Sequence, residues 1–362
     1  MDGKPEFEVV LATQTPAASF DDRSLPFSVV RAPTLFRLWR LIRSSDVIHI
    51  AGPSLAPLFL SWIARRPTVI EHHGYQAVCP NGLFVHQPDA AVCPGHFQAH
   101  RYGECLKCVA HESSKLRAAK SLLLMFPRYF LARRASASLV ISKYILRRFE
   151  FPRSSVIYYG IEDPFRDLQA MSAEGPSTGR ISFAYVGRLV SEKGIPVFLA
   201  AVGLLRNEGF SVDVSLIGDG PQRPELEAII ARNHLESCVQ ITGFLSGQAL
   251  SEAVRGVRVV VMPSVWEETA GLAAIEQMMR GKLVIASDIG GLAEVLGQSG
   301  LKCAPGDAKS LAEAMRQVLH QPAIVDSLGR TARTRALANF HRDRMIAEHV
   351  RVYKALAGQH QE

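Results

Sequence analysis

Short apolar runs alternate with amphipathic stretches along most of the chain. In the first half, the runs that predict strands are Phe7–Ala12, Val47–Ala51, Thr68–Glu71, Ser138–Ile141 and Val156–Tyr159. In the second half they are Ile181–Val186, Val212–Ile217, Val239–Thr242, Val257–Met262 and Leu283–Ala286. Apolar residues three and four apart, the period of a helix, are clearest in Ile195–Glu208, Gln222–Asn233, Ser246–Val254, Leu272–Arg280 and Ala308–Leu319. This alternation predicts βα units on parallel sheets.

The length of 362 residues suits two α/β domains. We expect a first Rossmann-like domain over residues 1–166 and a second over 167–340, facing each other across a cleft. Asp167–Arg180 is rich in Ser, Gly, Ala and Pro and predicts a hinge. Arg342–Ala357 has a helical pattern, and we expect residues 341–362 to form a helix that packs back on the first domain.

The net charge of +7 favours acidic partners, namely nucleotides, anionic lipid or nucleic acid, without choosing among them. No recognised nucleic-acid module is present, so nucleic acid is the least favoured. The chain shows neither a signal-peptide pattern nor an apolar run of about 18 residues, the length of a membrane span. We therefore expect a cytoplasmic protein.

Two cations follow the strand that ends at Val186. Gly187 allows a tight turn, and Arg188 and Lys193 lie in the loop before the next helix. Cations at a helix N-terminus can clamp a diphosphate. The alternative is two solvated charges on a loop.

Two glutamates flank the start of a predicted helix after the strand Val257–Met262. The amides of Gly271 and Leu272 would face an anion there, with Glu268 just before the helix and Glu276 inside it. Eight helical residues rise by about 12 Å, so one carboxylate can hold a hexose and the other a ribose. The alternative is that Glu268 caps the helix and Glu276 is exposed.

These segments resemble glycosyltransferase family 4, the retaining GT-B enzymes. The similarity runs from about Ile181 to Ala357 and includes Gly187-Arg-Leu-Val-Ser-Glu-Lys-Gly194, Gly218-Asp-Gly-Pro221, Gly243-Phe244, Glu268-x7-Glu276 and Ser287-Asp-Ile-Gly-Gly-Leu-Ala-Glu294. The resemblance implies that Arg188, Lys193 and the amides of Gly271 and Leu272 bind the donor diphosphate. It further implies that Glu276 binds the ribose and Glu268 the donor sugar. Thr269 and Ala270 stand where the family often has Pro-Phe, a change that bears on donor choice.

Val69–Gly82 in the first half resembles the family segment His-Asp-Tyr before Cys-Pro. His73 takes the His position and Gly74 replaces Asp. The resemblance places His73 near the anomeric carbon as a catalytic residue. A structural histidine is the alternative, and His72 competes for the assignment.

Four cysteines, Cys79, Cys93, Cys105 and Cys108, follow within a loop over residues 79–108. The last pair has the C-x2-C spacing of metal knuckles, and four thiolates suit tetrahedral zinc. The sequence predicts a structural zinc or, alternatively, free thiols, with His86, His96, His100 and His111 as substitute ligands. The family resemblance implies that catalysis needs no metal or other cofactor.

The segment from Lys115 to Arg148 is both basic and apolar. Such a surface suits the inner leaflet of a membrane, whereas the alternative is ordinary helices with solvated Lys and Arg side chains.

The resemblance in the first half begins at the family's second strand, matched by Phe7–Ala12. Its first strand, Gly-Gly loop and first helix have no counterpart. A Rossmann sheet is built around its first strand, so we expect a gap or a rearranged strand order in the first domain and little activity.

The resemblance implies retaining transfer of a sugar from a nucleoside diphosphate donor to a hydroxyl of a glycan or lipid-linked acceptor. Cell-envelope or exopolysaccharide assembly is the expected setting. Two alternatives stay open: a sugar-nucleotide epimerase on the same fold, and a catalytically impaired subunit that still binds nucleotide.

Overall fold

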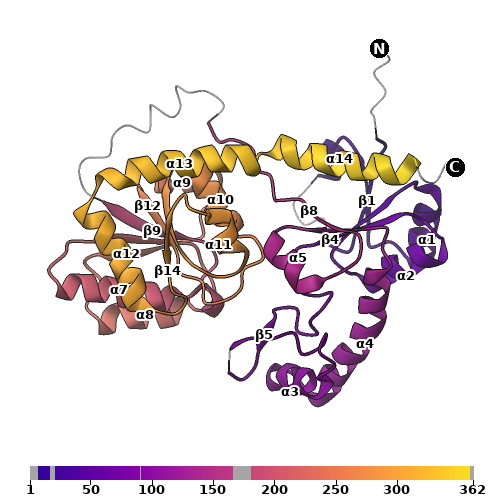
Figure 1. The fold of residues 1–362 in the computed structure, drawn as a ribbon, viewed down its shortest axis with the longest axis horizontal. Coiled ribbons are helices and arrows are strands. Elements are labelled where there is room, and N and C mark those ends of the chain that lie inside the picture. Colours follow the sequence, from indigo (N-terminus) through magenta and orange to yellow (C-terminus); the bar gives the residue numbers. More distant parts are fainter. Residues whose placement is uncertain (1–6, 17–20, 90, 166–180, 359–362) are drawn as a thin grey trace, which may run out of the picture.

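A computed structural model describes residues 7–16, 21–89, 91–165 and 181–358. The chain forms two α/β domains, joined along one side by the last two helices (Figure 1). The expected hinge, Asp167–Arg180, lies outside the described residues.

The strands of the first domain form two parallel sheets that share no hydrogen bonds among the described residues. One sheet pairs β1 (Val10–Thr13) with β2 (Ser28–Arg31). The other has the order β3-β4-β7-β8, formed by Ile48–Ala51, Thr68–His72, Ala137–Val140 and Ser154–Val156. The expected interruption of the first sheet is confirmed, because β1 and β3 both keep an edge that no described strand covers.

The first domain also has a two-stranded antiparallel hairpin and five described helices. The hairpin pairs β5 (Val85–His86) with β6 (Ala91–Val92). The helices are α1 (Leu35–Ser44), α2 (Leu55–Ile63), α3 (Tyr102–Glu112), α4 (Lys115–Arg133) and α5 (Lys143–Phe149). The helix α4 leads away from the sheet to α3, and the hairpin lies beside them (Figure 1).

The second domain is one parallel sheet with the order β11-β10-β9-β12-β13-β14. Its strands are β9 (Ser182–Val186), β10 (Asp213–Ile217), β11 (Val239–Gly243), β12 (Val259–Met262), β13 (Leu283–Ser287) and β14 (Leu301–Cys303). Numbered from β9, this order is 3-2-1-4-5-6, the Rossmann arrangement. In such sheets ligands bind beyond the carboxyl ends of the strands, where the order reverses between β9 and β12.

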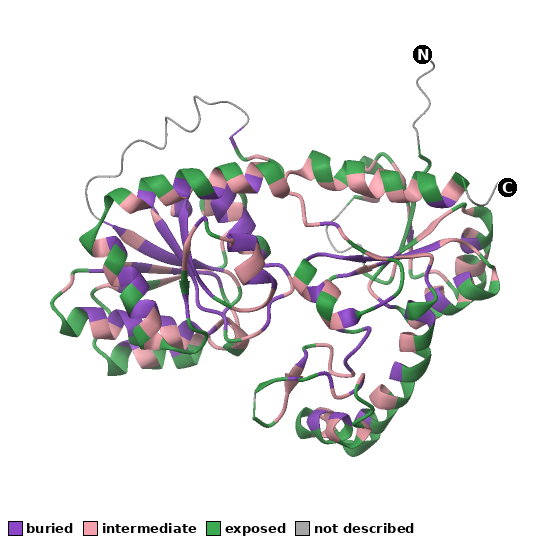
Figure 2. Cartoon of the chain, viewed as in Figure 1, coloured by how far each residue is buried: buried purple, intermediate pink, exposed green. Residues whose placement is uncertain are grey.

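Helices cover both faces of this sheet. They are α7 (Ile195–Asn207), α8 (Arg223–Arg232), α9 (Gly247–Arg255), α10 (Leu272–Met279), α11 (Gly290–Leu296), α12 (Ala308–His320) and α13 (Ala323–Asn339). Successive residues of β9 point to opposite faces, so Phe183 and Tyr185 enter one apolar core and Ala184 and Val186 the other. Both cores are closely filled, and Figure 2 shows the strands of this domain mostly buried.

The last helix, α14 (Arg342–Gly358), leaves the second domain and lies along the first (Figure 1). Leu356 is buried against Val69, Leu139 and Ile157 of the first domain. Tyr353 of the same helix contacts Phe7, with ring centroids 6.2 Å apart, and donates or accepts a 2.8 Å hydrogen bond with His49 of β3. The helix therefore contacts β3 and the segment just before β1.

The sequence missed β2, the hairpin and β14, which are only two to four residues long. It also placed the last strand of the first domain two residues late, at Val156–Tyr159 instead of Ser154–Val156. Short strands give too few alternations for periodicity to fix their ends.

The interruption predicts unequal protection of backbone amides. Val10 and Leu11 are 42% and 45% exposed, and a sheet of two strands is marginal in water. We expect the amides of β1 and β2 to exchange on the order of a hundredfold faster than those of β9 and β10, measured by hydrogen–deuterium exchange. Equal protection in both pairs of strands would contradict a weak, separate sheet.

Candidate active site

Two loops cross closely at the carboxyl edge of the second sheet. The amide of Gly187, after β9, donates a 3.0 Å hydrogen bond to the carbonyl of Ile217 at the end of β10. A Cβ on Gly218 would lie 1.9 Å from the carbonyl oxygen of Gly187, so only glycine fits there. This contact fixes the loop that holds Arg188 and Lys193.

The two residues predicted to bind the diphosphate, Arg188 and Lys193, differ in exposure and in ion pairing. The side chain of Arg188 is 77% exposed, and its one ion pair among the described residues is a 4.0 Å contact with Glu192. Lys193 Nζ lies 3.0 Å from Glu268 Oε1, and both side chains are largely buried. The structure thus brings Lys193 and Glu268 together and leaves the side chain of Arg188 exposed at the loop.

Glu268 lies in the loop between β12 and α10, and both its carboxylate and its backbone carbonyl are hydrogen-bonded. Its carboxylate also accepts a short hydrogen bond from the hydroxyl of Ser264. Its carbonyl accepts a 2.6 Å hydrogen bond from the amide of Gly291, at the start of α11. The carboxylate therefore sits where the loop, Lys193 and α11 meet.

The helix α10 begins as the sequence predicts. Gly271 is its N-cap, with a φ of +74° that favours glycine, and Leu272 is the first helical residue. The amides of Gly271 and Leu272 donate to no described residue. Ala270 is buried and Leu272 is exposed, so the loop packs inward while the helix start faces outward. These are the features of an anion-binding helix N-terminus.

Glu276 lies in the second turn of α10 and is half-buried. Burial raises the pKa of its carboxyl, and the charge of Arg280 opposes this only weakly. The side chain forms no hydrogen bond or ion pair with a described residue. A half-buried carboxylate with open acceptor positions is suited to the hydroxyls of a ligand.

The two adjacent histidines of the first domain have separate roles. His72 ends β4 in the core, where Nε2 is 2.8 Å from Ser138 Oγ. Burial, aided by the charge of His73, lowers the pKa of His72 to about 3, so its ring is neutral at physiological pH. His73 comes next and is 39% exposed, at the edge that faces the second domain.

His73 is held on three sides. Its Nδ1 lies 2.6 Å from the hydroxyl of Tyr159, and the two rings are stacked at 5.7 Å. Its Nε2 lies 3.9 Å from a carboxylate oxygen of Glu71. Its carbonyl accepts a 3.1 Å hydrogen bond from the hydroxyl of Thr269. The predicted catalytic histidine and the predicted donor loop are therefore in direct contact.

The carboxylate of Glu71 contacts three imidazole rings, a feature that was not predicted from the sequence. Its Oε2 lies 3.2 Å from His49, 3.6 Å from His349 of α14 and 3.9 Å from His73. Burial disfavours its charge, but hydrogen bonds from His349 and His49 hold the pKa of Glu71 far below its usual range. Burial alone would lower the pKa of His349. The hydrogen bond with Glu71 outweighs burial, so the pKa of His349 lies above its usual value. Glu71 thus links α14 to His73.

Further contacts join the domains around the donor loop, and sequence reasoning missed them as well. Arg148 Nη2 lies 2.7 Å from both carboxylate oxygens of Glu267. Tyr75 donates a 2.9 Å hydrogen bond to the carbonyl of Glu267, and Ser142 a 2.7 Å hydrogen bond to that of Thr269. Glu294 accepts hydrogen bonds from the amides of Lys143 and Tyr144 at the start of α5 and from the hydroxyl of Tyr158.

The four clustered cysteines are buried and line one small cavity with Asn81, His86 and His96. Cys79 donates to Asn81 Oδ1 at 2.9 Å, and Asn81 Nδ2 donates to Cys108 Sγ at 3.3 Å. Within the described residues, however, no three His, Cys, Asp or Glu side chains are arranged to hold a metal ion. The structure therefore brings the thiols together without testing the zinc prediction.

The basic segment 115–148 is not one surface. It divides into α4, the buried strand β7 and α5, and Arg148 is engaged with Glu267 between the domains. Arg148 does not belong to a free basic surface, because it pairs with Glu267 of the second domain, whereas Lys143 and Arg147 are exposed. Among the described residues, no helix combines the length and hydropathy needed to cross a bilayer.

Comparison with known proteins shows what the second half of the chain is similar to. Residues 180–321 match the family model described as Glycosyl transferases group 1. The 2-deoxystreptamine glucosyltransferase of Streptomyces kanamyceticus is 36% identical over 152 residues, which are 41% of this chain and 39% of that protein. The glycogen synthase of Mycobacterium tuberculosis is 33% identical over 186 residues, 51% of this chain and 45% of that protein. The matched region therefore spans less than half the length of either relative.

Solved structures show the same fold over nearly the whole chain. Alr3699/HepE of Anabaena in complex with UDP has a TM-score of 0.70 at 17% identity, covering 97% of this chain and all of that one. Its complex with UDP and glucose has a TM-score of 0.68 at 18% identity, covering 96% and 91%. Residues 180–321 are therefore similar to the group 1 glycosyltransferases, and the whole chain has the two-domain fold of the GT-B type that these structures share.

Proposed function

We propose that this protein transfers a sugar from a nucleoside diphosphate sugar to a hydroxyl of an acceptor, with retention at the anomeric carbon. The observation that supports it best is the contact between Thr269 and His73, at 3.1 Å. It places the predicted donor loop against the predicted catalytic histidine, on facing edges of two sheets. Alr3699/HepE, which shares the fold, has been solved with UDP-glucose.

In this proposal the donor lies along the start of α10. The diphosphate faces the amides of Gly271 and Leu272, and Arg188 and Lys193 neutralise its charge. Glu276 accepts hydrogen bonds from the ribose hydroxyls, since its carboxylate has no partner among the described residues. Glu268, Thr269 and Ala270 line the position of the sugar, beside His73.

The chemical step needs stabilisation of a departing diphosphate. As the bond from the anomeric carbon to the diphosphate breaks, a bond to the acceptor oxygen forms, and the proton of the acceptor hydroxyl leaves with the diphosphate. The cations and helix amides stabilise the developing charge electrostatically, a contribution of several kcal/mol. His73, held by Tyr159 and Glu71, positions a hydrogen bond near the anomeric carbon.

We further propose a glycan or lipid-linked acceptor in the assembly of envelope polysaccharide or exopolysaccharide. A location in the cytoplasm, on the inner face of a membrane, belongs to the same proposal. Its support is the net charge of +7, which suits an anionic leaflet.

The two rival functions make different predictions. An epimerase would convert the donor sugar without an acceptor, whereas a transferase would not. The interrupted sheet of the first domain favours an impaired subunit that binds nucleotide without turnover. The intact pairing of Lys193 with Glu268 favours a working site.

Loss of the Glu276 carboxylate should weaken nucleotide binding. We expect Glu276→Ala to lower the affinity for UDP, GDP or ADP by about 1.5–3 kcal/mol, measured by calorimetry, because the ribose loses a charged acceptor. Because burial raises the pKa of Glu276, affinity should also fall on mild acidification, at a higher pH than for an ordinary carboxylate. Exposed Glu236 is the control, and Glu236→Ala should bind as the wild type does. Unchanged affinity in Glu276→Ala would exclude the ribose role.

Removal of the His73 ring should reduce turnover and leave donor binding nearly unchanged. We expect His73→Ala to lower kcat by roughly 10²-fold, because a preorganised hydrogen bond at the reacting centre is lost. The measurement is nucleoside diphosphate release from a panel of UDP-, GDP- and ADP-sugars with membrane lipid extract as acceptor. His320→Ala, at an exposed histidine on α12, is the control.

The same assay without acceptor separates the rival functions. Formation of an epimer from donor alone would favour the epimerase. Nucleotide binding with no product under any condition would favour the impaired subunit.

We also propose that Cys79, Cys93, Cys105 and Cys108 bind one structural zinc, with the thiols drawing together around the cavity that they line. We expect about one zinc per chain by elemental analysis of protein purified without added metal. Cys105→Ser/Cys108→Ser should lose the metal, whereas Cys238→Ser, at a cysteine outside the cluster, should keep it. Zinc-free protein whose four thiols all react freely would return the cluster to ordinary buried thiols.

A further inference from the structure

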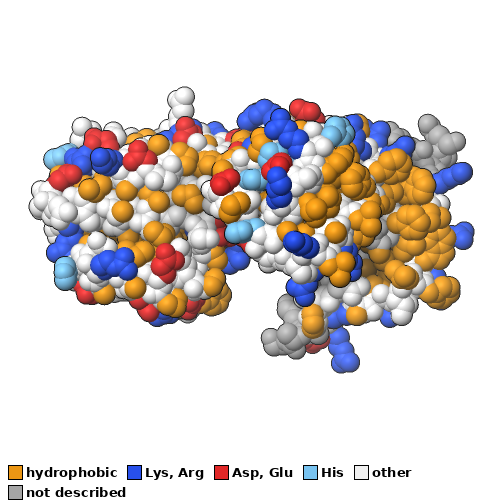
Figure 3. All heavy atoms as spheres, turned by 90° about the horizontal axis from the view of Figure 1, so that it is seen from below, with side chains coloured by type: hydrophobic (Ala, Val, Ile, Leu, Met, Phe, Trp, Pro, Cys, Tyr) orange, Lys and Arg blue, Asp and Glu red, His pale blue; other side chains and the backbone are white. Residues whose placement is uncertain are grey.

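Three helices on one side of the first domain contain no acidic residue. They are α1, α2 and α4, and α2 contacts both of the others. Three arginines lie in α1, and five lysines and arginines lie in α4. Large hydrophobic side chains are exposed on all three helices, and Figure 3 shows hydrophobic side chains gathered over this half of the molecule.

The outer face of α4 is apolar. Leu116, Leu123 and Phe130 are spaced by seven residues and therefore share one face, where they are 80%, 69% and 45% exposed. The opposite face, with Ala118 and Met125, is buried. An ordinary surface helix has polar and charged residues on its outer face.

The neighbouring helix α2 repeats this pattern. Phe59, Trp62 and Ile63 are three and four positions apart and are 49%, 50% and 48% exposed. Phe59 and Trp62 contact each other, with ring centroids 6.3 Å apart. Exposed aromatic rings beside cations are typical of helices that lie in the interface of a membrane.

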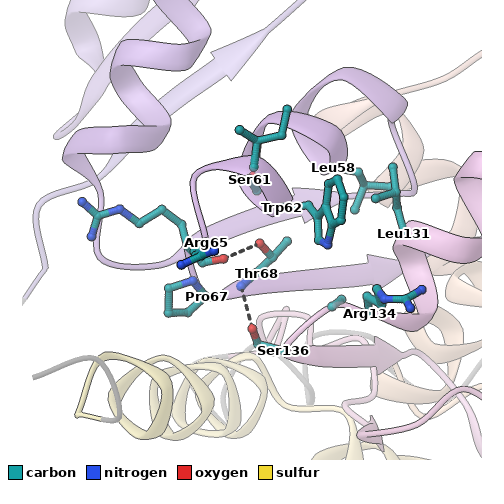
Figure 4. A pocket seen from close by; sticks show the side chains of 12 residues that line it. Leu58, Ser61, Trp62, Arg65, Pro67, Thr68, Leu131, Arg134 and Ser136 are labelled. Carbon is teal, nitrogen blue, oxygen red and sulfur yellow. Dashed lines mark hydrogen bonds between the residues drawn. The ribbon is translucent and has the colours of Figure 1, made fainter. Parts of the chain in front are cut away.

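A cavity of about 520 Å³ lies between α2, the start of β4 and the end of α4. Arg65 and Arg134 line it together with Trp62 and Leu131 (Figure 4). Arg66 lines it as well. Arg134 lies over the ring of Phe130, 3.6 Å from its centroid, and Arg66 donates to the carbonyl of Arg43. None of the three guanidinium groups forms an ion pair with a carboxylate in the described part of the chain.

This cavity is remote from the proposed donor site. It opens beside Thr68, the first residue of β4, whereas His73 follows the other end of that strand. Five residues of strand separate the two by about 16 Å. A ligand in the cavity would therefore leave the donor loop accessible.

We propose that this face docks on an anionic membrane surface, with a lipid phosphate held by Arg65, Arg66 and Arg134. The exposed side chains of α2 and α4 would enter the interfacial layer. Guanidinium groups bind phosphate bidentately, and the absence of acidic residues from these three helices leaves the attraction unopposed. The proposal deepens the membrane location proposed above, and its test is independent of the transferase activity.

Vesicle flotation with the whole chain tests this proposal. The probes are phosphatidylcholine vesicles with and without about one third phosphatidylglycerol. We expect retention on the anionic vesicles only, falling as salt rises. Leu123→Glu and, separately, Arg65→Gln/Arg134→Gln should each lower retention by at least about tenfold.

Two matched variants serve as controls. Ile346→Glu places the same charge at a similarly exposed residue of α14 (47%), and Arg232→Gln removes an exposed arginine of the second domain. Both should float as the wild type does, and thermal melting should show every variant folded. All substitutions are at exposed side chains, and the Gln variants keep the proposal testable if Leu123→Glu is unstable.

Three outcomes would overturn the proposal. They are no retention on anionic vesicles, equal retention on neutral and anionic vesicles, and controls that fall as far as the test variants. Light scattering that shows a dimer dissociated by Leu123→Glu would assign the face to a second copy instead.

Discussion

The arrangement of the site depends on the loop between β12 and α10, which is hydrogen-bonded on both sides. Within the second domain, the carbonyl of Glu268 accepts from Gly291 and its carboxylate pairs with Lys193. Across the cleft, Thr269 bonds His73 and Ser142. The contact with Ser142 uses the carbonyl of Thr269, whereas the contact with His73 uses its side-chain hydroxyl, so a substitution at 269 that removes the hydroxyl would also loosen the loop from His73.

Much of the second domain could be predicted because local rules agree there. Every strand except β14 lies in a recognisable apolar run, and Gly187, Gly218 and Gly271 mark the turns at the carboxyl edge. The start of α10 and the position of Glu276 within that helix also follow from sequence. The ion pair between Glu268 and Lys193 could not be predicted, since Lys193 lies 75 residues earlier in the chain. Only the fold of the sheet brings Lys193 Nζ to 3.0 Å from Glu268 Oε1.

Contacts between the domains lay beyond sequence reasoning for a related reason. Glu294 caps α5 from another domain, and Glu267 meets Arg148 across the cleft. A local pattern reports the face on which a side chain lies but not what faces it. The partner of Arg148 could not be predicted because the carboxylate that pairs with it, on Glu267, lies 119 residues away. The different surroundings of His72 and His73 follow from register, since β4 ends at His72 and turns that ring into the core.

Because the first sheet is interrupted, the contacts that α14 makes with the first domain are structurally important. Since β1 and β3 share no hydrogen bonds, their relative position must be held by side chains. Tyr353 touches Phe7 just before β1 and His49 in β3, and His349, one turn earlier, contacts Glu71 in β4. Glu71 in turn lies beside His73. A helix that starts from the second domain therefore contacts the segment before β1, the strand β3 and Glu71, so displacement of α14 would disturb the surroundings of His73 without any change in the loop between β12 and α10.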